Sequence, residues 1–351
     1  MGPSQDLNAE HLLIRVDGNA QMGAGHVMRC LALAGAAQTA GRQPVFVMAQ
    51  PAEALVHRLS SQGFQVHLNA SEPGSVDDAV ETAGVIRQRR AQWLVVDGYH
   101  FNARFLHILN EEGVNLLCID DFGQEGYAYA DVIVNQNGYA DLSLYPDRRA
   151  GAHLLLGSRY VLLRPEFWPW RTTTRTIADA AHKVLVTLGG GDFHNVTMQV
   201  LQALQTIRDC SLQCLVVVGG SNPHVAQIQK AIEPYAPNYQ LLRDVSNMPE
   251  LMAWADIAVS AAGTTSWELA FMGLPTLAIV LADNQELVAR YISEVGSAQN
   301  LGSYETLSAQ PLADVVRALL HSPERRAAMS RAGRALVDGY GTQRVLAAMQ
   351  N

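Results

Sequence analysis

The sequence is most constrained by an alternation of short apolar runs with longer helical segments, which occurs once in each half. In the first half, runs rich in Val, Ile and Leu are predicted to be strands at 12–16, 45–48, 66–68, 94–97, 116–120 and 132–135. Helical segments separate these runs. Strands that are apolar throughout and alternate with helices are typical of a parallel sheet with helices on both faces. We therefore predict an α/β fold.

A second alternation follows a looser stretch rich in Pro, Trp and Thr. Its predicted strands are 184–188, 215–218, 257–260 and 276–279. The 351 residues exceed the usual size of one domain, so two domains are expected. We predict a polar leader at 1–11, a first domain at 12–163, a linker at 164–182, and a second domain at 183–351 whose last helix is able to pack back on the first. The two doubly wound halves are expected to face each other across a cleft.

Composition and charge exclude several classes of protein. The formal net charge of −8 disfavours nucleic-acid binding, which needs basic patches. No apolar run reaches about 18 residues, so no membrane span is expected. Residues 1–11 are polar and partly acidic, unlike a signal peptide. No C-x-x-C occurs, so we expect a cytoplasmic protein with reduced, buried thiols at Cys30, Cys118, Cys210 and Cys214.

A glycine turn carries the first candidate for chemistry. Gly23-Ala24-Gly25-His26 follows the first predicted strand and opens a helix that includes Arg29. Glycines allow a sharp turn and a close approach to a ligand. The helix start offers free N–H groups and the positive end of its dipole, so an imidazole there is placed for proton transfer. The alternative is an ordinary strand-to-helix turn with His26 near the cap, because short glycine motifs are weak signals.

Polar residues follow several first-half strands, at the edge where ligands of parallel sheets bind. They are Asp17, Asp97 (followed by Gly98-Tyr99-His100), the pair Asp120-Asp121, and Asn135-Gln136-Asn137. Each alone is more simply a turn-former, but their convergence favours a site. Neighbouring side chains at a strand end point to opposite sides. We therefore expect one aspartate of the pair to face the cleft and the other to hold the following turn.

The strongest chemical signal in the second half is the stretch 260–268. Gly263-Thr264-Thr265-Ser266 offers hydroxyl donors beside a helix start, and Glu268 lies just inside that helix. Such a turn suits a phosphate, and the carboxylate suits a ribose diol. An ordinary capping run is the alternative. Gly189-Gly190-Gly191 forms a second phosphate-sized loop, without the Gly-Lys-Ser/Thr of a P-loop.

Several other catalytic motifs are absent from the sequence. It contains no H-E-x-x-H, G-x-S-x-G, G-x-G-x-x-G or D-x-D, and no His and Cys at zinc spacing. Neither a metal nor an organic cofactor is therefore expected. Helix N-termini and hydroxyl groups would have to stabilise a leaving phosphate.

These motifs together resemble those of the nucleotide-sugar hydrolases of pseudaminic acid biosynthesis. The resemblance begins at Asp17 to Arg29 (G-x-G-H-x-x-R) and extends to 260–285. Between these ends it includes 96–99, 120–121, 134–137, 157–167 and 187–192. The second half also resembles UDP-sugar transferases of the undecaprenyl-muropeptide N-acetylglucosaminyltransferase kind. These families share the GT-B fold, so the resemblance implies two Rossmann-like domains.

The resemblance also implies an activity: hydrolysis of UDP-2,4-diacetamido-2,4,6-trideoxy-β-L-altropyranose to the free sugar and UDP. His26 matches the histidine that activates water, and Glu268 matches the glutamate that holds the UDP ribose. Residues 264–266 match the diphosphate-binding turn, and 245–248 match the segment whose backbone reads uracil. Asn284 and Gln285 match a polar pair on the sugar side.

The predicted site follows from these matches and from the strand-end residues. The predicted catalytic residues are His26, Asp17 and Asn284. The predicted substrate contacts are Gly23, Gly25, Arg29, Asp97, Tyr99, Asn137, Gly190, Met248, Gly263, Thr264, Thr265, Ser266, Glu268 and Gln285.

Neutral imidazole suits a general base, because it titrates near neutrality. His26 would deprotonate water as it attacks the anomeric carbon, with inversion. A GT-B glycosyltransferase, a hydrolysing UDP-sugar 2-epimerase and a non-catalytic nucleotide-sugar-binding module are the alternatives. The expected partners are the UDP-sugar and UDP, and we expect a monomer or weak dimer.

Overall fold

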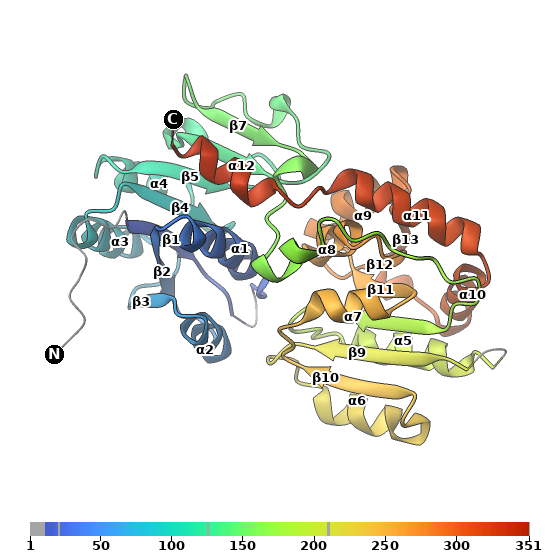
Figure 1. The fold of residues 1–351 in the computed structure, drawn as a ribbon. Helices are drawn as coiled ribbons and strands as arrows, with labels where there is room; N and C mark the ends of the chain where they lie inside the picture. Colours follow the sequence, from blue (N-terminus) through green and yellow to red (C-terminus); the bar gives the residue numbers. More distant parts are fainter. Residues whose placement is uncertain (1–10, 20–21, 125, 209–210, 351) are drawn as a thin grey trace. The chain divides into compact units, whose positions relative to one another are not determined.

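The computed structural model describes residues 11–19, 22–124, 126–208 and 211–350, and the chain forms two compact units. Unit 1 comprises the described residues of 1–165 and 340–351, and unit 2 comprises 166–339. Figure 1 shows each unit built on its own sheet. Residues 1–10 of the predicted leader and Cys210 lie outside the described residues.

Unit 1 contains a seven-stranded sheet in the order β3-β2-β1-β4-β5-β6-β7, with all neighbours parallel. Val16 pairs with Asp97 across β1 and β4, and Asp97 pairs with Ile119 across β4 and β5. The carboxyl ends of these three central strands are therefore level. The strands are β1 (His11–Val16), β2 (Gln43–Ala49), β3 (Gln65–Asn69), β4 (Trp93–Asp97), β5 (Asn115–Ile119), β6 (Val132–Asn135) and β7 (His153–Leu156).

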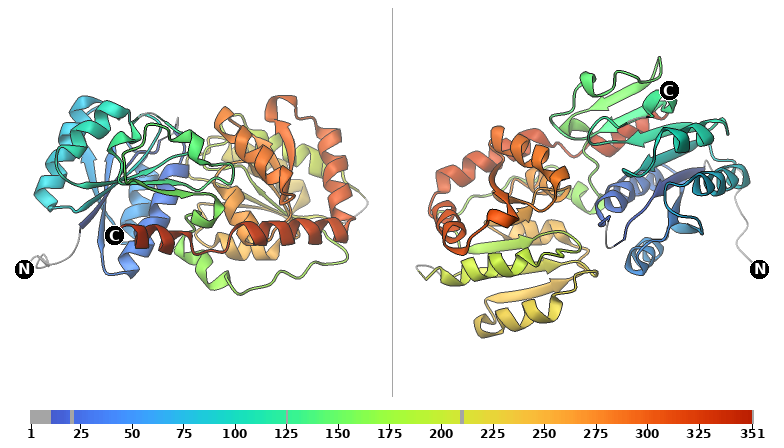
Figure 2. Two further views of the ribbon diagram at one scale, coloured as in Figure 1. Left: turned by 90° about the horizontal axis from the view of Figure 1, so that it is seen from above. Right: turned by 180° about the vertical axis from the view of Figure 1, so that it is seen from behind.

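Helices cover both faces of this sheet. α3 and α4 pack together on one face, and α1 and α12 pack together on the other (Figure 2). The start of α3 is capped by Ser75, whose hydroxyl accepts the Asp78 N–H. The helices are α1 (Gly25–Thr39), α2 (Glu53–Ser61), α3 (Val76–Arg89), α4 (Ala103–Asn110) and α12 (Gly341–Ala348).

Unit 2 contains a six-stranded parallel sheet in the order β10-β9-β8-β11-β12-β13. Its strands are β8 (Lys183–Thr187), β9 (Gln213–Val218), β10 (Tyr239–Arg243), β11 (Ile257–Ala261), β12 (Thr276–Val280) and β13 (Ala298–Ser303). Its helices are α5 (Val196–Thr206), α6 (Val225–Ile232), α7 (Met248–Trp254), α8 (Thr265–Phe271), α9 (Glu286–Glu294), α10 (Ala309–Leu320) and α11 (Pro323–Leu336). Within the described ranges, no helix is both long and apolar enough to cross a membrane.

Two doubly wound parallel sheets confirm the predicted α/β fold. Every predicted strand is present, but the structure adds β7, β10 and β13. All three lie at a sheet edge. An edge strand pairs on one side only and faces more water, so it need not be apolar throughout. β13, with the sequence AQNLGS, is the clearest case.

The segments on either side of the unit boundary belong to definite units. Residues 166–182, expected as a linker, are grouped with unit 2. In this segment Arg175 donates to the carbonyl oxygens of Ala255 and Met272, at 2.6 and 3.1 Å. Helix α12 was expected at the end of the second domain or packed back on the first, and it belongs to unit 1, where it packs against α1.

Gly341, the first residue of α12, lies where no side chain fits. A Cβ at this position would overlap the Val161 carbonyl oxygen. We expect Gly341→Ala to destabilise unit 1 by about 1–3 kcal/mol, because one of the two backbones must shift. Denaturant unfolding of the full chain measures this change. The control is Gly84→Ala in α3, where the added Cβ meets nothing within 4 Å; equal stability of the two variants would contradict the prediction.

Candidate functional site

The glycine turn before α1 places His26 in the first turn of the helix. Gly23 has a φ of 74°, a conformation that favours glycine, and its N–H donates to the Asn19 carbonyl at 2.9 Å. Helix α1 begins at Gly25, and no side chain among the described residues caps its start at Ala24. The N–H groups of this turn and the positive end of the helix dipole therefore lie beside His26.

Asp97, the last residue of β4, holds the His26 imidazole. Its Oδ1 lies 2.7 Å from His26 Nδ1. Arg29, one helical turn after His26, donates to both oxygens of Asp97, from Nε to Oδ2 at 2.7 Å and from Nη2 to Oδ1 at 2.6 Å. The carboxylate is thus shared between the imidazole and the guanidinium.

The same contacts assign the imidazole proton. Arg29 Nη2 also lies 3.1 Å from His26 Nδ1. A guanidinium can only donate and an ionised carboxylate can only accept. The shorter contact, to Asp97, therefore assigns the proton to Nδ1 and leaves Nε2 as the basic nitrogen. The side chain of His26 is 13% exposed.

Asp121, which follows β5, forms the far side of this group. Both its oxygens accept from Arg29 Nη1, at 2.8 and 3.0 Å. Asn137 Nδ2 donates to Oδ1 at 2.7 Å, and the Tyr99 hydroxyl donates to Oδ2 at 2.8 Å. The Tyr99 ring meets the His26 ring edge-on, with centroids 4.7 Å apart. We call this group the imidazole cluster: His26, Arg29, Asp97, Tyr99, Asp121 and Asn137.

Burial and ion pairing act in opposite directions on the charges of the imidazole cluster. Burial raises the pKa of Asp97, but Arg29 and then His26 outweigh it and hold this pKa well below its usual range. Burial also raises the pKa of Asp121, and Arg29 again outweighs it, so the net direction is down. Burial lowers the pKa of Arg29, while Asp121 and Asp97 raise it well above its ordinary value. All three side chains are therefore charged at neutral pH.

Asp120 and Asp121 point to opposite sides of the strand end, as expected. Asp120 Oδ2 accepts the Gly123 N–H at 2.6 Å and the Tyr145 hydroxyl at 2.6 Å. It therefore holds the turn after β5, while Asp121 contacts Arg29. The two carboxylates contact different groups and do not form an acid–base pair.

Asp17, predicted to be catalytic, lies in a different buried group. Its Oδ1 lies 2.7 Å from Arg15 Nη1, and its Oδ2 lies 2.8 Å from His100 Nε2. Arg15 also donates to both oxygens of Asp78, at 3.1 and 2.6 Å. Among the described residues, the contacts of Asp17 lead to this arginine cluster (Arg15, Asp17, Asp78 and His100) and to the Ala49 N–H, not to His26.

In unit 2, the predicted phosphate turn joins β11 to α8. Thr264 precedes α8 and Thr265 begins it, and both are half-buried. Ser266 is buried, and its hydroxyl lies 3.4 Å from the Ala261 carbonyl oxygen. Glu268 is half-buried in the same first turn of α8. The structure thus keeps these four predicted residues on one short segment.

Gln285 brings the segment after β12 beside this turn. A Cβ on Gly263 would lie 3.7 Å from Gln285 Nε2. The Gln285 Oε1 accepts the Leu281 N–H at 3.0 Å, which fixes the side chain. The preceding residue, Asn284, is exposed.

The glycine loop after β8 packs closely on the loop after β9. The Gly190 carbonyl accepts from the Ser221 hydroxyl at 3.0 Å, and a Cβ on Gly219 would lie 2.5 Å from the same oxygen. Asp192 accepts two N–H groups at the start of α5, so it acts as a capping carboxylate. Met248 begins α7 and is buried.

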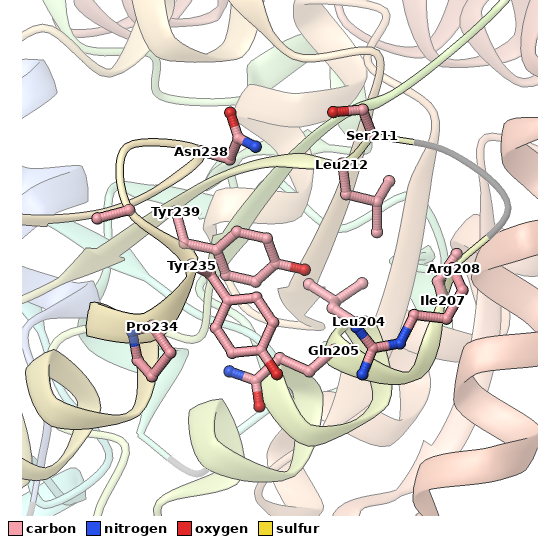
Figure 3. A pocket seen from close by; sticks show the side chains of 11 residues that line it. Leu204, Gln205, Ile207, Arg208, Ser211, Leu212, Pro234, Tyr235, Asn238 and Tyr239 are labelled. Atoms are coloured by element: carbon pink, nitrogen blue, oxygen red, sulfur yellow. The ribbon is translucent and has the colours of Figure 1, made fainter.

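A cavity of about 360 Å³ in unit 2 lies away from these loops. Its walls come from the end of α5 and the starts of β9 and β10, at the amino ends of the strands. Figure 3 shows the rings of Tyr235 and Tyr239 lining it, with Arg208 nearby. The predicted loops lie at the opposite, carboxyl ends. Within the described ranges, no group of three or more His, Cys, Asp or Glu side chains could hold a metal ion.

Sequence reasoning did not place Asp121 among the site residues, although it contacts three of them. Its chief partner, Arg29, is 92 residues away in the sequence, so no spacing rule links the two. Cys30 was also not predicted as a neighbour of the site, yet its thiol donates to Asp97 Oδ2 at 3.4 Å. Burial raises the pKa of this thiol well above its usual range, so it stays neutral.

Comparisons with known proteins agree with this organisation. Residues 183–339 match the model of the glycosyltransferase family 28 C-terminal domain. The chain is 26% identical to the spore coat polysaccharide biosynthesis protein SpsG of Bacillus subtilis, over 97% of this chain and 98% of that protein. It is 24% identical to the UDP-2,4-diacetamido-2,4,6-trideoxy-beta-L-altropyranose hydrolase of Campylobacter jejuni, over 81% of this chain and 97% of that protein.

Solved structures with low sequence identity share the fold. MurG of Acinetobacter baumannii matches with a TM-score of 0.71 at 17% identity, covering 97% of this chain and 99% of that one. MnaA of S. aureus, solved with UDP, matches with a TM-score of 0.68 at 12% identity, covering 97% and 96%. With the two parallel sheets, these likenesses show that the chain has the GT-B fold, with a domain like that of glycosyltransferase family 28 in unit 2.

Proposed function

We propose that this protein is an enzyme that hydrolyses a UDP-activated sugar to UDP and the free sugar. The observation that carries the proposal is the His26 imidazole, held at Nδ1 by Asp97 at 2.7 Å beside an uncapped helix start. A histidine oriented by a carboxylate, with its second nitrogen free, is the arrangement expected of a general base. The 24% identity to the Campylobacter jejuni hydrolase supports the choice of reaction.

In the proposed reaction, a water oxygen bonds to the anomeric carbon. The bond from that carbon to the β-phosphate oxygen breaks, and its electron pair stays on UDP. The water proton moves to His26 Nε2, while Asp97 keeps the other proton on Nδ1 and stabilises the imidazolium. This single displacement inverts the anomeric centre.

The nucleotide part of the proposal rests on unit 2. The match of residues 183–339 to a glycosyltransferase domain supports UDP binding there. We assign the diphosphate to Gly263 and residues 264–266, the ribose to Glu268, the uracil to the segment ending at Met248, and further phosphate contacts to Gly190. Among the described residues, a Cβ added to Gly263 would come within 4 Å of Gln285 alone. Asn284 and Gln285 are assigned to the sugar side.

We further propose a 2,4-diacetamido-2,4,6-trideoxyhexose as the sugar, in a pathway of the pseudaminic acid type in the cytoplasm. The hydrolase from Campylobacter jejuni carries this sugar in its name. The longer match is to a protein named for spore coat polysaccharide biosynthesis. A small panel of UDP-diacetamido-trideoxy sugars is therefore the substrate set to test.

The deciding experiment incubates the purified chain with each UDP-sugar in H₂¹⁸O, without an acceptor. We expect equal amounts of UDP and free sugar, with ¹⁸O at the anomeric carbon and inverted configuration. Label in UDP instead would mean attack at phosphorus and would overturn the mechanism. A free sugar inverted at C2 would indicate an epimerase. Release of UDP only when a hydroxyl acceptor is added would indicate a transferase. Binding of the UDP-sugar without release of UDP would indicate a non-catalytic module.

A further inference from the structure

We propose that Asp121 is a positioning residue that raises the base strength of His26 from the far side of Arg29. The proposal rests on the proposed function for its catalytic meaning, but its central measurement does not need turnover. Among the described residues, the Asp121 side chain contacts Arg29, Tyr99 and Asn137, and not His26. It acts through two side chains that do lie against the imidazole, Arg29 and Tyr99.

The first step is the charge balance of the imidazole cluster. Asp97 and Asp121 are both ionised, and among the described residues the cation that pairs with both of them is Arg29. With a neutral imidazole, the cluster therefore carries one more negative charge than positive. Protonation of His26 brings the cluster to neutrality. Without Asp121, Arg29 would already neutralise Asp97, and the imidazolium would add an unbalanced buried charge.

The second step is that the Asp121 charge is only weakly screened by water. Its side chain is only 11% exposed, and its oxygens accept from Arg29, Asn137 and Tyr99. Charges in such surroundings interact more strongly than charges at the surface. The Asp121 carboxylate is itself stabilised by the charge of His26, as expected if the two groups interact.

The third step is that Asp121 also fixes the ring that packs on the imidazole. The Tyr99 hydroxyl donates to Asp121 at 2.8 Å, and the Tyr99 ring lies edge-on to His26. The Tyr99 ring also lies against the Phe122 ring, with centroids 5.4 Å apart. Asp121 therefore acts on His26 in two ways: through its charge, by way of Arg29, and through the position of the Tyr99 ring.

The other ionisable groups described near His26 are paired, neutral or directed elsewhere. Asp97 lies on β4, Arg29 and Cys30 lie on α1 with His26, and Tyr99 lies in the loop after β4. The Cys30 thiol is neutral. Asp120 points to the Gly123 turn, and Asp17 is paired with Arg15 and His100. Among the described residues, Asp121 is thus the carboxylate outside the His26–Asp97 pair whose charge bears on the imidazole through Arg29.

The test is the titration of the His26 ring, followed by NMR of ¹³C-histidine-labelled full chain without substrate. We expect Asp121→Asn to move the titration midpoint of His26 to lower pH, and Asp120→Asn, the neighbouring carboxylate, to leave it in place. A folded Asp121→Asn protein with an unchanged midpoint would overturn the proposal. Because this measurement needs no turnover, it separates failure of the proposal from failure of the proposed function.

Kinetics supply the second readout. If the chain is a hydrolase, Asp121→Asn should lower kcat/KM at neutral pH by about tenfold, with the acidic limb of the pH profile displaced to lower pH. Asp121→Glu, which keeps the charge, should restore the position of that limb even if kcat stays reduced. A loss of activity with the limb in its original position for both variants would mean a merely structural role.

Tyr99→Phe keeps the proposal testable if Asp121→Asn does not fold. Tyr99 is half-exposed, so loss of its hydroxyl should not unfold unit 1. The variant removes one donor from the Asp121 carboxylate and leaves its charge less compensated. The His26 midpoint is therefore expected to rise, and a fall would contradict the proposal.

Discussion

His26→Ala is expected to lower the rate of UDP-sugar hydrolysis by about 10²–10⁴-fold, the usual contribution of a general base. Water at neutral pH is a weak nucleophile, and no other side chain of the imidazole cluster can take its proton. Both oxygens of Asp97 already accept hydrogen bonds from Arg29. The Arg29 charge also lowers the pKa of this carboxylate against the effect of burial. UDP release under saturating substrate measures the loss.

The same variant should bind UDP nearly as well as the parent, because the proposed nucleotide contacts lie on unit 2. Titration of UDP by calorimetry checks this. His26→Asn is the matched variant, since its amide can still donate to Asp97. The control is His107→Ala on α4, where the side chain is half-exposed and pairs only loosely with Glu111, at 3.6 Å. Turnover by His26→Ala at the parent rate would remove His26 as the base.

Asp78→Ala is expected to destabilise unit 1 by about 3–5 kcal/mol, the usual cost of removing one partner of a buried ion pair. The Arg15 guanidinium is completely buried and lies between Asp17 and Asp78. Asp78 also accepts from Asn69 Nδ2 at 2.7 Å and from the Gly74 N–H at 2.8 Å, so further donors lose their partner. Urea unfolding of the full chain gives the free energy, and hydrogen exchange along β1 and α3 assigns the loss to unit 1.

Asp77→Ala provides the control for this prediction. Asp77 is the neighbouring carboxylate in the first turn of α3, but it is exposed. Its loss should cost at most about 1 kcal/mol, through the helix dipole. If Asp78→Ala proves as stable as Asp77→Ala, the pairing of Arg15 with Asp17 is sufficient by itself, and Asp78 does not stabilise unit 1.

The fold could be predicted from the sequence where strands are buried on both faces. Val45–Met48 and Leu116–Ile119 are continuous apolar runs, and both lie in strands inside the sheet, β2 and β5. Edge strands such as β13 carry no such signal. They pair with one neighbouring strand only and face more water, so their residues need not be apolar. The position of α12 was similarly ambiguous, because the sequence of an amphipathic helix does not show which of the two hydrophobic cores it packs against.

The site could be predicted as far as residue types at strand ends, but not as far as their pairings. Position after β1 suggested Asp17 as a catalytic residue, while its side chain neutralises Arg15 and contacts His100. A signal for that role was present: Arg15 interrupts an apolar strand, and a buried arginine requires carboxylate partners. Asp121 could not be chosen over Asp120 without knowing which side of the sheet Arg29 occupies.

Helix α12 has a consequence for the order in which the protein is made. The segment that completes the first sheet's helical cover is translated only after all of unit 2. Domains generally fold as they leave the ribosome. Unit 1 therefore cannot complete its fold until the end of translation, and the α1 surface that α12 covers stays exposed until then. Unit 2 can complete its fold earlier.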